Sequence, residues 1–177
     1  MTGPEVGALA FTIFLAGQRL WELRKSRTNE AALRAKGAVE SGQSHFPLLV
    51  AVHVLLLVGI LAETFLLRTD PGPYWPRWGA LFLAGQFLRY SAMRALGPMW
   101  NVKILVPPKF KRVTTGPYKW FPHPNYLGVV MEVLGAPMMF GAWRTAVIVS
   151  LLNAVALFVR VRAEEQALTS GASPRRA

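Results

Sequence analysis

Cysteine is absent from the 177-residue chain, and charged residues are scarce. The absence of cysteine excludes a disulfide framework, a thiolate nucleophile and a cysteine-ligated metal. Charged residues make up 16% of the chain, whereas an ordinary soluble domain carries about 25%. Hydrophobic residues make up 53% of the chain. This composition predicts a membrane protein.

Acidic residues are few as well: there are 9 of them against 20 Lys and Arg, which gives a net charge of +11. Such an excess is also typical of proteins that bind nucleic acid. Here, however, the basic residues cluster between long apolar runs and form no continuous basic face. The charge therefore indicates membrane topology, and no nucleic-acid partner is expected.

The chain has only 3 histidines. His45 and His53 flank the start of one apolar run, and His123 follows much later. A metal site built on them would lack obvious further ligands, so no metal is expected. We expect His45 and His53 to serve helix packing and the membrane interface.

Several apolar runs approach the roughly 20 residues that cross a bilayer's hydrocarbon core. They cover residues 6–23, 46–67, 78–96, 126–140 and 145–161. The short fourth run is expected to form a helical hairpin with the fifth, turning at 141–144. Because lipid does not tolerate open sheet edges, we expect an all-α integral membrane bundle of about five transmembrane helices, forming one domain over residues 1–177.

The basic residues also predict an orientation. Most of them lie in the segments 24–36, 103–119 and 160–176, whereas Arg68, Arg77 and Arg144 lie on the opposite side of the predicted spans. The basic side is expected to be cytoplasmic, which places the N-terminus outside and the C-terminus in the cytoplasm, most simply in a bacterial cytoplasmic membrane.

Two details concern the first part of the chain. The first five residues lack the basic start of a secretory signal, so the first apolar run is expected to be retained as a span. Residues 29–37 are expected to form a separate short surface helix that Gly37 ends, with a solvated basic linker as the alternative.

A polar, turn-rich segment at residues 113–128 runs directly into the fourth apolar run. Pro122 and Pro124 bias the residues before them away from helical geometry, so His123 is expected on extended backbone just outside a helix. Asn125 is a candidate cap for that helix, whose first amides favour an anionic group. A plain membrane-entry loop is the alternative interpretation.

The third run carries polar residues at helical spacing, namely Gln86, Tyr90 and Arg94, with Arg89 on a neighbouring line. Lining of a pocket and snorkelling of Arg94 to the interface both explain this pattern. Residues 101–106 alternate enough to be extended. With residues 109–120 they form a segment long enough to cap the cytoplasmic mouth of the bundle.

The predicted hairpin brings distant residues together. Equal rises along its two helices put Glu132 opposite Asn153 and bring His123 near the C-terminal charges. Asn153, Arg160 and Glu164 lie near one line along the last helix and are a candidate site wall. A charged helix end with internal ion pairs is the alternative for residues 160–165.

The chain resembles the isoprenylcysteine carboxyl methyltransferase family of integral membrane enzymes, over residues 96–168. The matching residues are Val113-Thr114-Thr115-Gly116-Pro117-Tyr118, His123-Pro124-Asn125-Tyr126-Leu127-Gly128, and Arg160 followed by Glu164-Glu165. Residues 18–23 and 45–47 are similar to a bacterial branch found beside type III polyketide synthases, whose members methylate alkylpyrones or alkylresorcinols. Pro122 departs from the arginine that is common in the family, and Lys119 or Arg112 is a candidate substitute.

The resemblance implies S-adenosylmethionine as cofactor and S-adenosylhomocysteine as product, held by a core at residues 97–168. Its implied catalytic residues are Arg160, which suits an acceptor oxyanion, and Glu164. Glu164 and Glu165 suit the cofactor's ammonium group. The implied cofactor-binding residues are Val113, Gly116, Tyr118, His123, Pro124, Asn125, Tyr126, Leu127, Glu164 and Glu165.

The expected function is O-methylation of a lipid-like acceptor, either an isoprenylcysteine-type carboxylate or an alkylpyrone- or alkylresorcinol-type hydroxyl. The expected partners are this acceptor and membrane lipids. Two alternatives stay open: N-methylation of a lipid amine, and a non-catalytic membrane scaffold or lipid-binding protein.

Overall fold

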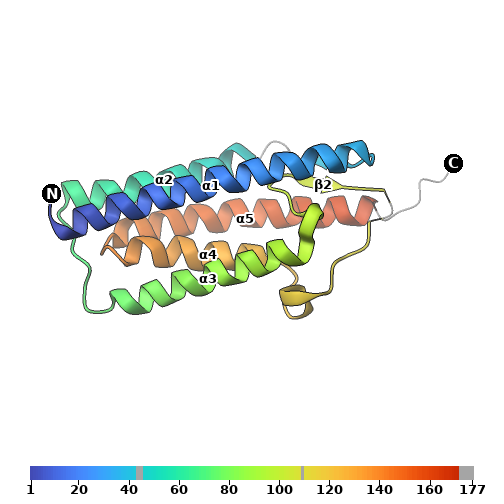
Figure 1. The fold of residues 1–177 in the computed structure, drawn as a ribbon. Coiled ribbons are helices and arrows are strands. Elements are labelled where there is room, and N and C mark those ends of the chain that lie inside the picture. The colour runs from blue at the N-terminus through green and yellow to red at the C-terminus, as the bar shows by residue number, and fades with distance from the viewer. Residues whose placement is uncertain (43–45, 109, 172–177) are drawn as a thin grey trace.

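The computed structural model describes residues 1–42, 46–108 and 110–171. Long α-helices form most of it and run side by side along one axis (Figure 1). They are α1 (Gly3–Ala35), α2 (Phe46–Leu66), α3 (Trp75–Leu96), α4 (Pro124–Met138) and α5 (Trp143–Gly171). The short elements are strands β1 (Val39–Ser41) and β2 (Ile104–Val106) and the 3-10 helices η2 (Gly97–Met99) and η3 (Gly116–Lys119).

The predicted helical architecture is confirmed, with one small addition. β1 and β2 pair antiparallel, with Glu40 opposite Leu105, so the fold is not purely α. The pair lies at the end of the bundle where α1 and α5 end (Figure 1). The extended conformation predicted for residues 101–106 is seen at β2. Outside the hydrocarbon region a sheet edge carries little penalty, so this addition is compatible with a membrane bundle.

Helix α1 differs from its prediction. It runs without interruption through 33 residues, so the separate surface helix expected at residues 29–37 is wrong. No proline breaks the segment after its first turn, and the helix continues until Gly37 takes a φ of +81°. At the start, a capping box joins Thr2 and Glu5.

Within the described residues, two helices are long and apolar enough to cross a membrane, α2 and most of α5. The α4 helix has only 15 residues, and the polar side chains of α1 and α3 lower their hydropathy. The structure therefore supports two of the expected spans by length and composition.

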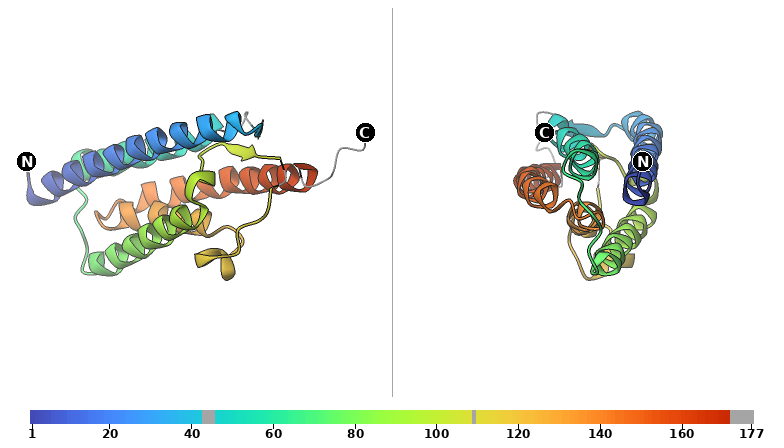
Figure 2. Two further views of the ribbon diagram at one scale, coloured as in Figure 1. Left: turned by 45° about the vertical axis from the view of Figure 1, so that its right-hand side comes forward. Right: turned by 90° about the vertical axis from the view of Figure 1, so that its left-hand side faces the viewer.

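The helices pack around α4, which lies between α3 and α5, while α2 contacts both α5 and α1 (Figure 2). Glycines let α3 and α4 approach closely. A Cβ added at Gly128 would lie 2.4 Å from the Arg89 Cγ and 2.8 Å from the Gly85 carbonyl oxygen. This contact places the side chain of Arg89 against α4.

The hairpin of α4 and α5 turns where the sequence predicts, with Gly141 at a φ of +69°. The predicted pairing of Glu132 with Asn153 is wrong, however. Glu132 bonds to Arg19 and Arg89, and the Asn153 Oδ1 is buried with no hydrogen bond in the described part of the chain. Equal rise fixes the height of a residue but not its rotation about the helix, and Glu132 faces α1 and α3.

Candidate functional site

The start of α4 is built by the proline-rich motif. His123 is the residue before the helix, with φ −132° and ψ 64°, and Pro124 occupies its first turn. The expected cap at Asn125 is therefore wrong, because Asn125 already lies inside the helix. Its Oδ1 is buried without a hydrogen-bond partner among the described residues.

This motif meets the C-terminal part of α5, as the hairpin predicts. The His123 Nε2 lies 3.1 Å from a Glu165 carboxylate oxygen, and its Nδ1 lies 3.9 Å from the Glu164 carboxylate. The imidazole stacks on the ring of Tyr126 at a centroid distance of 5.4 Å. The proline-restricted backbone before α4 and the packing of α4 against α5 together fix the position of the motif.

Tyr126 connects two predicted site residues. Its hydroxyl donates to the Glu164 carboxylate and accepts a hydrogen bond of 3.1 Å from the Arg160 Nε. Arg160 is 4% exposed. Arg160 and Glu164, two residues of the predicted line on α5, therefore face α4, where a tyrosine joins them.

A cavity of about 460 Å³ begins at these residues and extends between the helices. Tyr118, on η3, also lines it, and burial together with the nearby Glu164 carboxylate raises the pKa of the Tyr118 hydroxyl. The side of the cavity made by the motif and α5 is called the motif end here. Its polar lining residues are Tyr118, His123, Asn125, Tyr126, Arg160 and Glu164.

The remaining predicted site residues lie around the motif end without lining the cavity. Gly116 has a φ of +59°, and a Cβ there would lie 3.2 Å from the Ala95 Cβ of α3. Leu127 is 38% exposed. Glu165 pairs with Arg112 and His123. Val113 is half-buried in the preceding loop, and Pro124 is fully buried.

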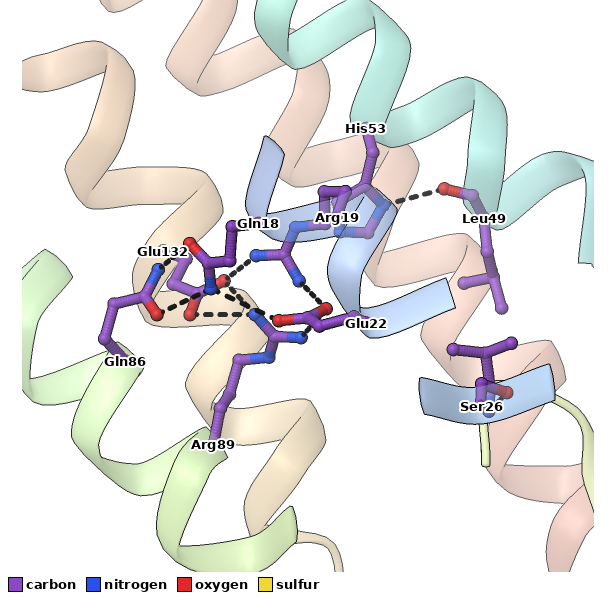
Figure 3. A network of polar contacts seen from close by, with 10 residues as sticks. Gln18, Arg19, Glu22, Ser26, Leu49, His53, Gln86, Arg89 and Glu132 are labelled. Atoms are coloured by element: carbon purple, nitrogen blue, oxygen red, sulfur yellow. Dashed lines mark hydrogen bonds and ion pairs between the residues drawn. The ribbon is translucent and has the colours of Figure 1, made fainter. Parts of the chain in front are cut away.

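A buried network of charges forms a second polar part of the cavity wall (Figure 3). Glu132 accepts hydrogen bonds from Arg19 at 2.6 Å and from Arg89 at 2.9 Å. Glu22 accepts from the same two guanidinium groups, at 2.6 Å and 2.7 Å. The Gln18 and Gln86 amides bond to each other at 2.8 Å beside this network.

The part of the cavity that this network lines is called the charged end here. Its residues are Arg19, Glu22, His53 and Arg89. Arg89 lines the cavity and is 3% exposed, whereas Arg94 is exposed. Of the two explanations for the polar residues of α3, pocket lining therefore holds for Arg89.

Pocket lining by Arg89 was one of the two explanations from the sequence, but the meeting of Arg89 with Arg19, Glu22 and His53 at the charged end was not predicted. Its members come from α1, α2 and α3, and no local motif links them. One signal was available: Arg19 and Glu22 are ionisable residues inside an apolar run, where a charge is expected to face a protein interior.

Residues 99–107 cover the cavity from a third side. They are fastened to α1, because Ser26 exchanges hydrogen bonds with Asn101 and Val102, each of 3.0 Å. Lys103 forms an ion pair of 2.9 Å with Glu30. The predicted capping segment is thus held in place by α1.

The walls between the two ends are apolar and reach the surface of the bundle. Leu20 of α1 and Val50 and Val54 of α2 line the cavity and are also exposed. A ligand with a polar head and an apolar tail would therefore meet matching surfaces in one continuous cavity.

Comparison with known proteins places this geometry in context. Residues 78–170 match the sequence profile of the isoprenylcysteine carboxyl methyltransferase (ICMT) family. The uncharacterized protein YpbQ of Bacillus subtilis is 42% identical over 151 residues, which cover 85% of this chain and 90% of that protein. An uncharacterized protein of Haemophilus influenzae is 26% identical over 152 residues, covering 85% and 88%. No solved structure matches the chain.

Proposed function

Because the chain belongs to the ICMT family, which indicates a membrane methyltransferase, we propose that it is an S-adenosylmethionine-dependent O-methyltransferase acting on a lipophilic acceptor. The observation that carries this proposal is a continuous cavity, in which the motif end joins apolar walls open to the surface of the bundle. A water-soluble cofactor and a lipid-like acceptor can meet there.

The motif end has groups that suit the cofactor. The buried Asn125 Oδ1 has no partner within the described residues, and it would accept a hydrogen bond from a cofactor amino or hydroxyl group. Tyr118 and Tyr126 offer aromatic faces to the adenosine. Glu164 provides a carboxylate for the ammonium group. These residues would hold the cofactor, which supplies a methyl group already activated by its sulfonium.

The other predicted cofactor residues position the side chains that contact the cofactor. Gly116 and Val113 shape the loop that positions Tyr118, and Pro124 fixes the start of α4. Glu165 holds His123 and Arg112 in place. Leu127 lies on the outer side of α4, where we propose packing rather than cofactor contact.

Arg160 is proposed to hold the acceptor oxygen. Its guanidinium lines the cavity beside Tyr126, and this planar, permanently charged group suits an oxyanion. Transfer of an activated methyl group requires mainly alignment and exclusion of water. The covering segment at residues 99–107 keeps water out of the cavity.

The basic residues support the proposed orientation in a bacterial cytoplasmic membrane, with the N-terminus outside. A tag inserted near Gly37 and one after Ala177 are expected in the cytoplasm, and one near Gly72 outside. Labelling in intact cells tests this, and a protected Gly72 tag with an accessible Ala177 tag would reverse the orientation.

The activity is tested with purified protein, isotope-labelled S-adenosylmethionine and a bacterial lipid extract. We expect S-adenosylhomocysteine to bind, as measured by calorimetry, and mass spectrometry to find the label as an O-methyl group on a lipophilic product. Label on a lipid amine would instead indicate N-methylation. Absence of both binding and transfer would favour a non-catalytic scaffold.

A further inference from the structure

The charged end has no role in the function proposed so far. Its two guanidinium groups, on Arg19 and Arg89, are balanced by the carboxylates of Glu22 and Glu132, so the network carries no net formal charge. An ion-pair network is costly to bury, and this one also lines a cavity. A neutral polar ligand suits such a surface better than a charged ligand.

His53 offers a hydrogen-bond acceptor at this end. The His53 Nδ1 lies 2.8 Å from the Leu49 carbonyl oxygen. A carbonyl can only accept, so the Nδ1 carries the proton. In a neutral imidazole this leaves the Nε2 with a lone pair, and Arg19 lies nearby (Figure 3). No hydrogen bond joins this Nε2 to the rest of the described chain.

Arg89 offers an unused donor. Its terminal nitrogens bond to Glu22 and Glu132, but the Nε is buried without a partner among the described residues. A buried donor without a partner is destabilising by itself, so its occurrence in a cavity wall indicates a ligand position.

We propose that the charged end binds the polar head of the acceptor and that His53 determines specificity, by accepting a hydrogen bond from a hydroxyl distinct from the oxygen that is methylated. The acceptor class is therefore a lipophilic molecule whose head carries at least two oxygens, one of them a hydroxyl. This inference rests on the proposed function and narrows it.

A carboxylate does not suit this position. It has no proton to donate to the His53 Nε2, and its charge would face the carboxylates of Glu22 and Glu132 without a free counter-charge. An alkylammonium head can donate but would lie beside Arg19 and Arg89. A hydroxyl can donate to His53 and leaves the network neutral.

The test compares two phenols with the same long alkyl chain in detergent micelles: one with two ring hydroxyls in a 1,3 arrangement, the other with a single hydroxyl. Equilibrium binding of each is measured without cofactor to the wild type, to His53→Phe and to His53→Gln. We expect the wild type to prefer the dihydroxy compound about five- to tenfold, the value of one hydrogen bond.

The His53→Phe variant should lose this preference while binding the monohydroxy compound as the wild type does. The His53→Gln variant, which keeps an acceptor oxygen, should retain part of the preference. S-adenosylhomocysteine should bind all three proteins equally, which establishes that the motif end is intact. A purely structural histidine would not change the ratio between two ligands.

Equal binding of the two phenols by the wild type, or an unchanged ratio in a folded His53→Phe variant, overturns the inference. Tighter wild-type binding of the analogue with a carboxylate in place of the second hydroxyl overturns it as well. If His53→Phe does not fold, the His53→Gln ratio decides. Failure of the wild type to bind S-adenosylhomocysteine refutes the proposed function instead, because the phenol ratio is measured without cofactor.

Discussion

The two ends of the cavity hold their charges in different ways. At the motif end and beside it, Arg160 is buried, but the side chains of His123, Glu164 and Glu165 are 19%, 29% and 38% exposed. At the charged end and beside it, the side chains of Glu22, Arg89 and Glu132 are 3–4% exposed. Water screens the first group and leaves it available for a soluble ligand, whereas the second group depends on its protein partners.

This difference predicts separable consequences of mutation. Changes at the charged end should chiefly alter folding stability, because an ion that loses its partner stays buried. Changes of the partly exposed groups at the motif end should chiefly alter ligand binding, since water can replace a lost contact there. Single substitutions at each end test whether stability and ligand binding respond in this way.

The largest stability effect is expected for Glu132→Gln. It leaves the charges of Arg19 and Arg89 with only Glu22 to balance them, at a cost of about 3–5 kcal/mol in the free energy of unfolding. Thermal unfolding in detergent measures it. The matched control is Glu30→Gln in a partly exposed pair with Lys103, where the loss should be below about 1 kcal/mol. Equal losses would refute the contrast.

The next effect is expected where α3 and α4 touch. Gly128→Ala would place a methyl group 2.4 Å from the Arg89 Cγ, so the helices must separate, at a cost of about 1–3 kcal/mol in unfolding free energy. Gly17→Ala in α1 is the control, because an added Cβ there would meet no described residue within 4 Å apart from its own helical turn. It should leave the unfolding midpoint unchanged or raised. A Gly128→Ala variant as stable as wild type would mean that the contact is loose.

At the motif end, Glu164→Gln should weaken S-adenosylmethionine binding about ten- to a hundredfold, because it removes a charge-assisted hydrogen bond of about 1.5–3 kcal/mol. Calorimetry measures the affinity. Glu165→Gln is the control, since Glu165 pairs with Arg112 and His123 and does not line the cavity. The loss of affinity in Glu165→Gln should be several-fold smaller than in Glu164→Gln. A larger loss in Glu165→Gln would mean that Glu165, and not Glu164, binds the ammonium group.

Substitution of Arg160 should lower the rate of methyl transfer and leave the cofactor affinity nearly unchanged. Arg160→Lys should bind the cofactor nearly as the wild type does but lower the rate of labelled methyl transfer, since an ammonium cannot reproduce the planar guanidinium grip. Full turnover in a folded variant would indicate that Arg160 serves mainly to hold Tyr126.

The smallest effect concerns the segment that covers the cavity. The hydrogen bond from Lys103, aided by Arg34, lowers the pKa of Glu30 below its ordinary value of 4.5. A lowered folded-state pKa stabilises the fold above the unfolded-state pKa, and this contribution disappears as the pH falls through the folded-state value. The difference in unfolding midpoint between wild type and Glu30→Gln should therefore vanish in acid. If the difference in unfolding midpoint persists at acidic pH, packing of the side chain and not the ion pair causes it.

The sequence allowed the helical class, the hairpin and the meeting of the motif with α5 to be predicted, because apolar run length, Pro and Gly punctuation and helical rise are local properties. The continuity of α1 was missed, since a polar stretch resembles a loop when α1's contacts with residues 100–103 are unknown. The charged end was missed because the rotation of each helix decides which polar residue faces which. Glu132 lies opposite Asn153 in height, yet it bonds to Arg19 and Arg89.

A crystal structure of the protein with S-adenosylhomocysteine bound tests the roles of the two ends of the cavity most directly. We predict the ligand at the motif end, with its ammonium group within hydrogen-bond distance of the Glu164 carboxylate, a polar group at the Asn125 Oδ1 and its adenosine against Tyr118 or Tyr126. The charged end should remain free for the acceptor. A ligand bound outside the cavity, or one that occupies the position beside His53 and Arg89, would contradict the account.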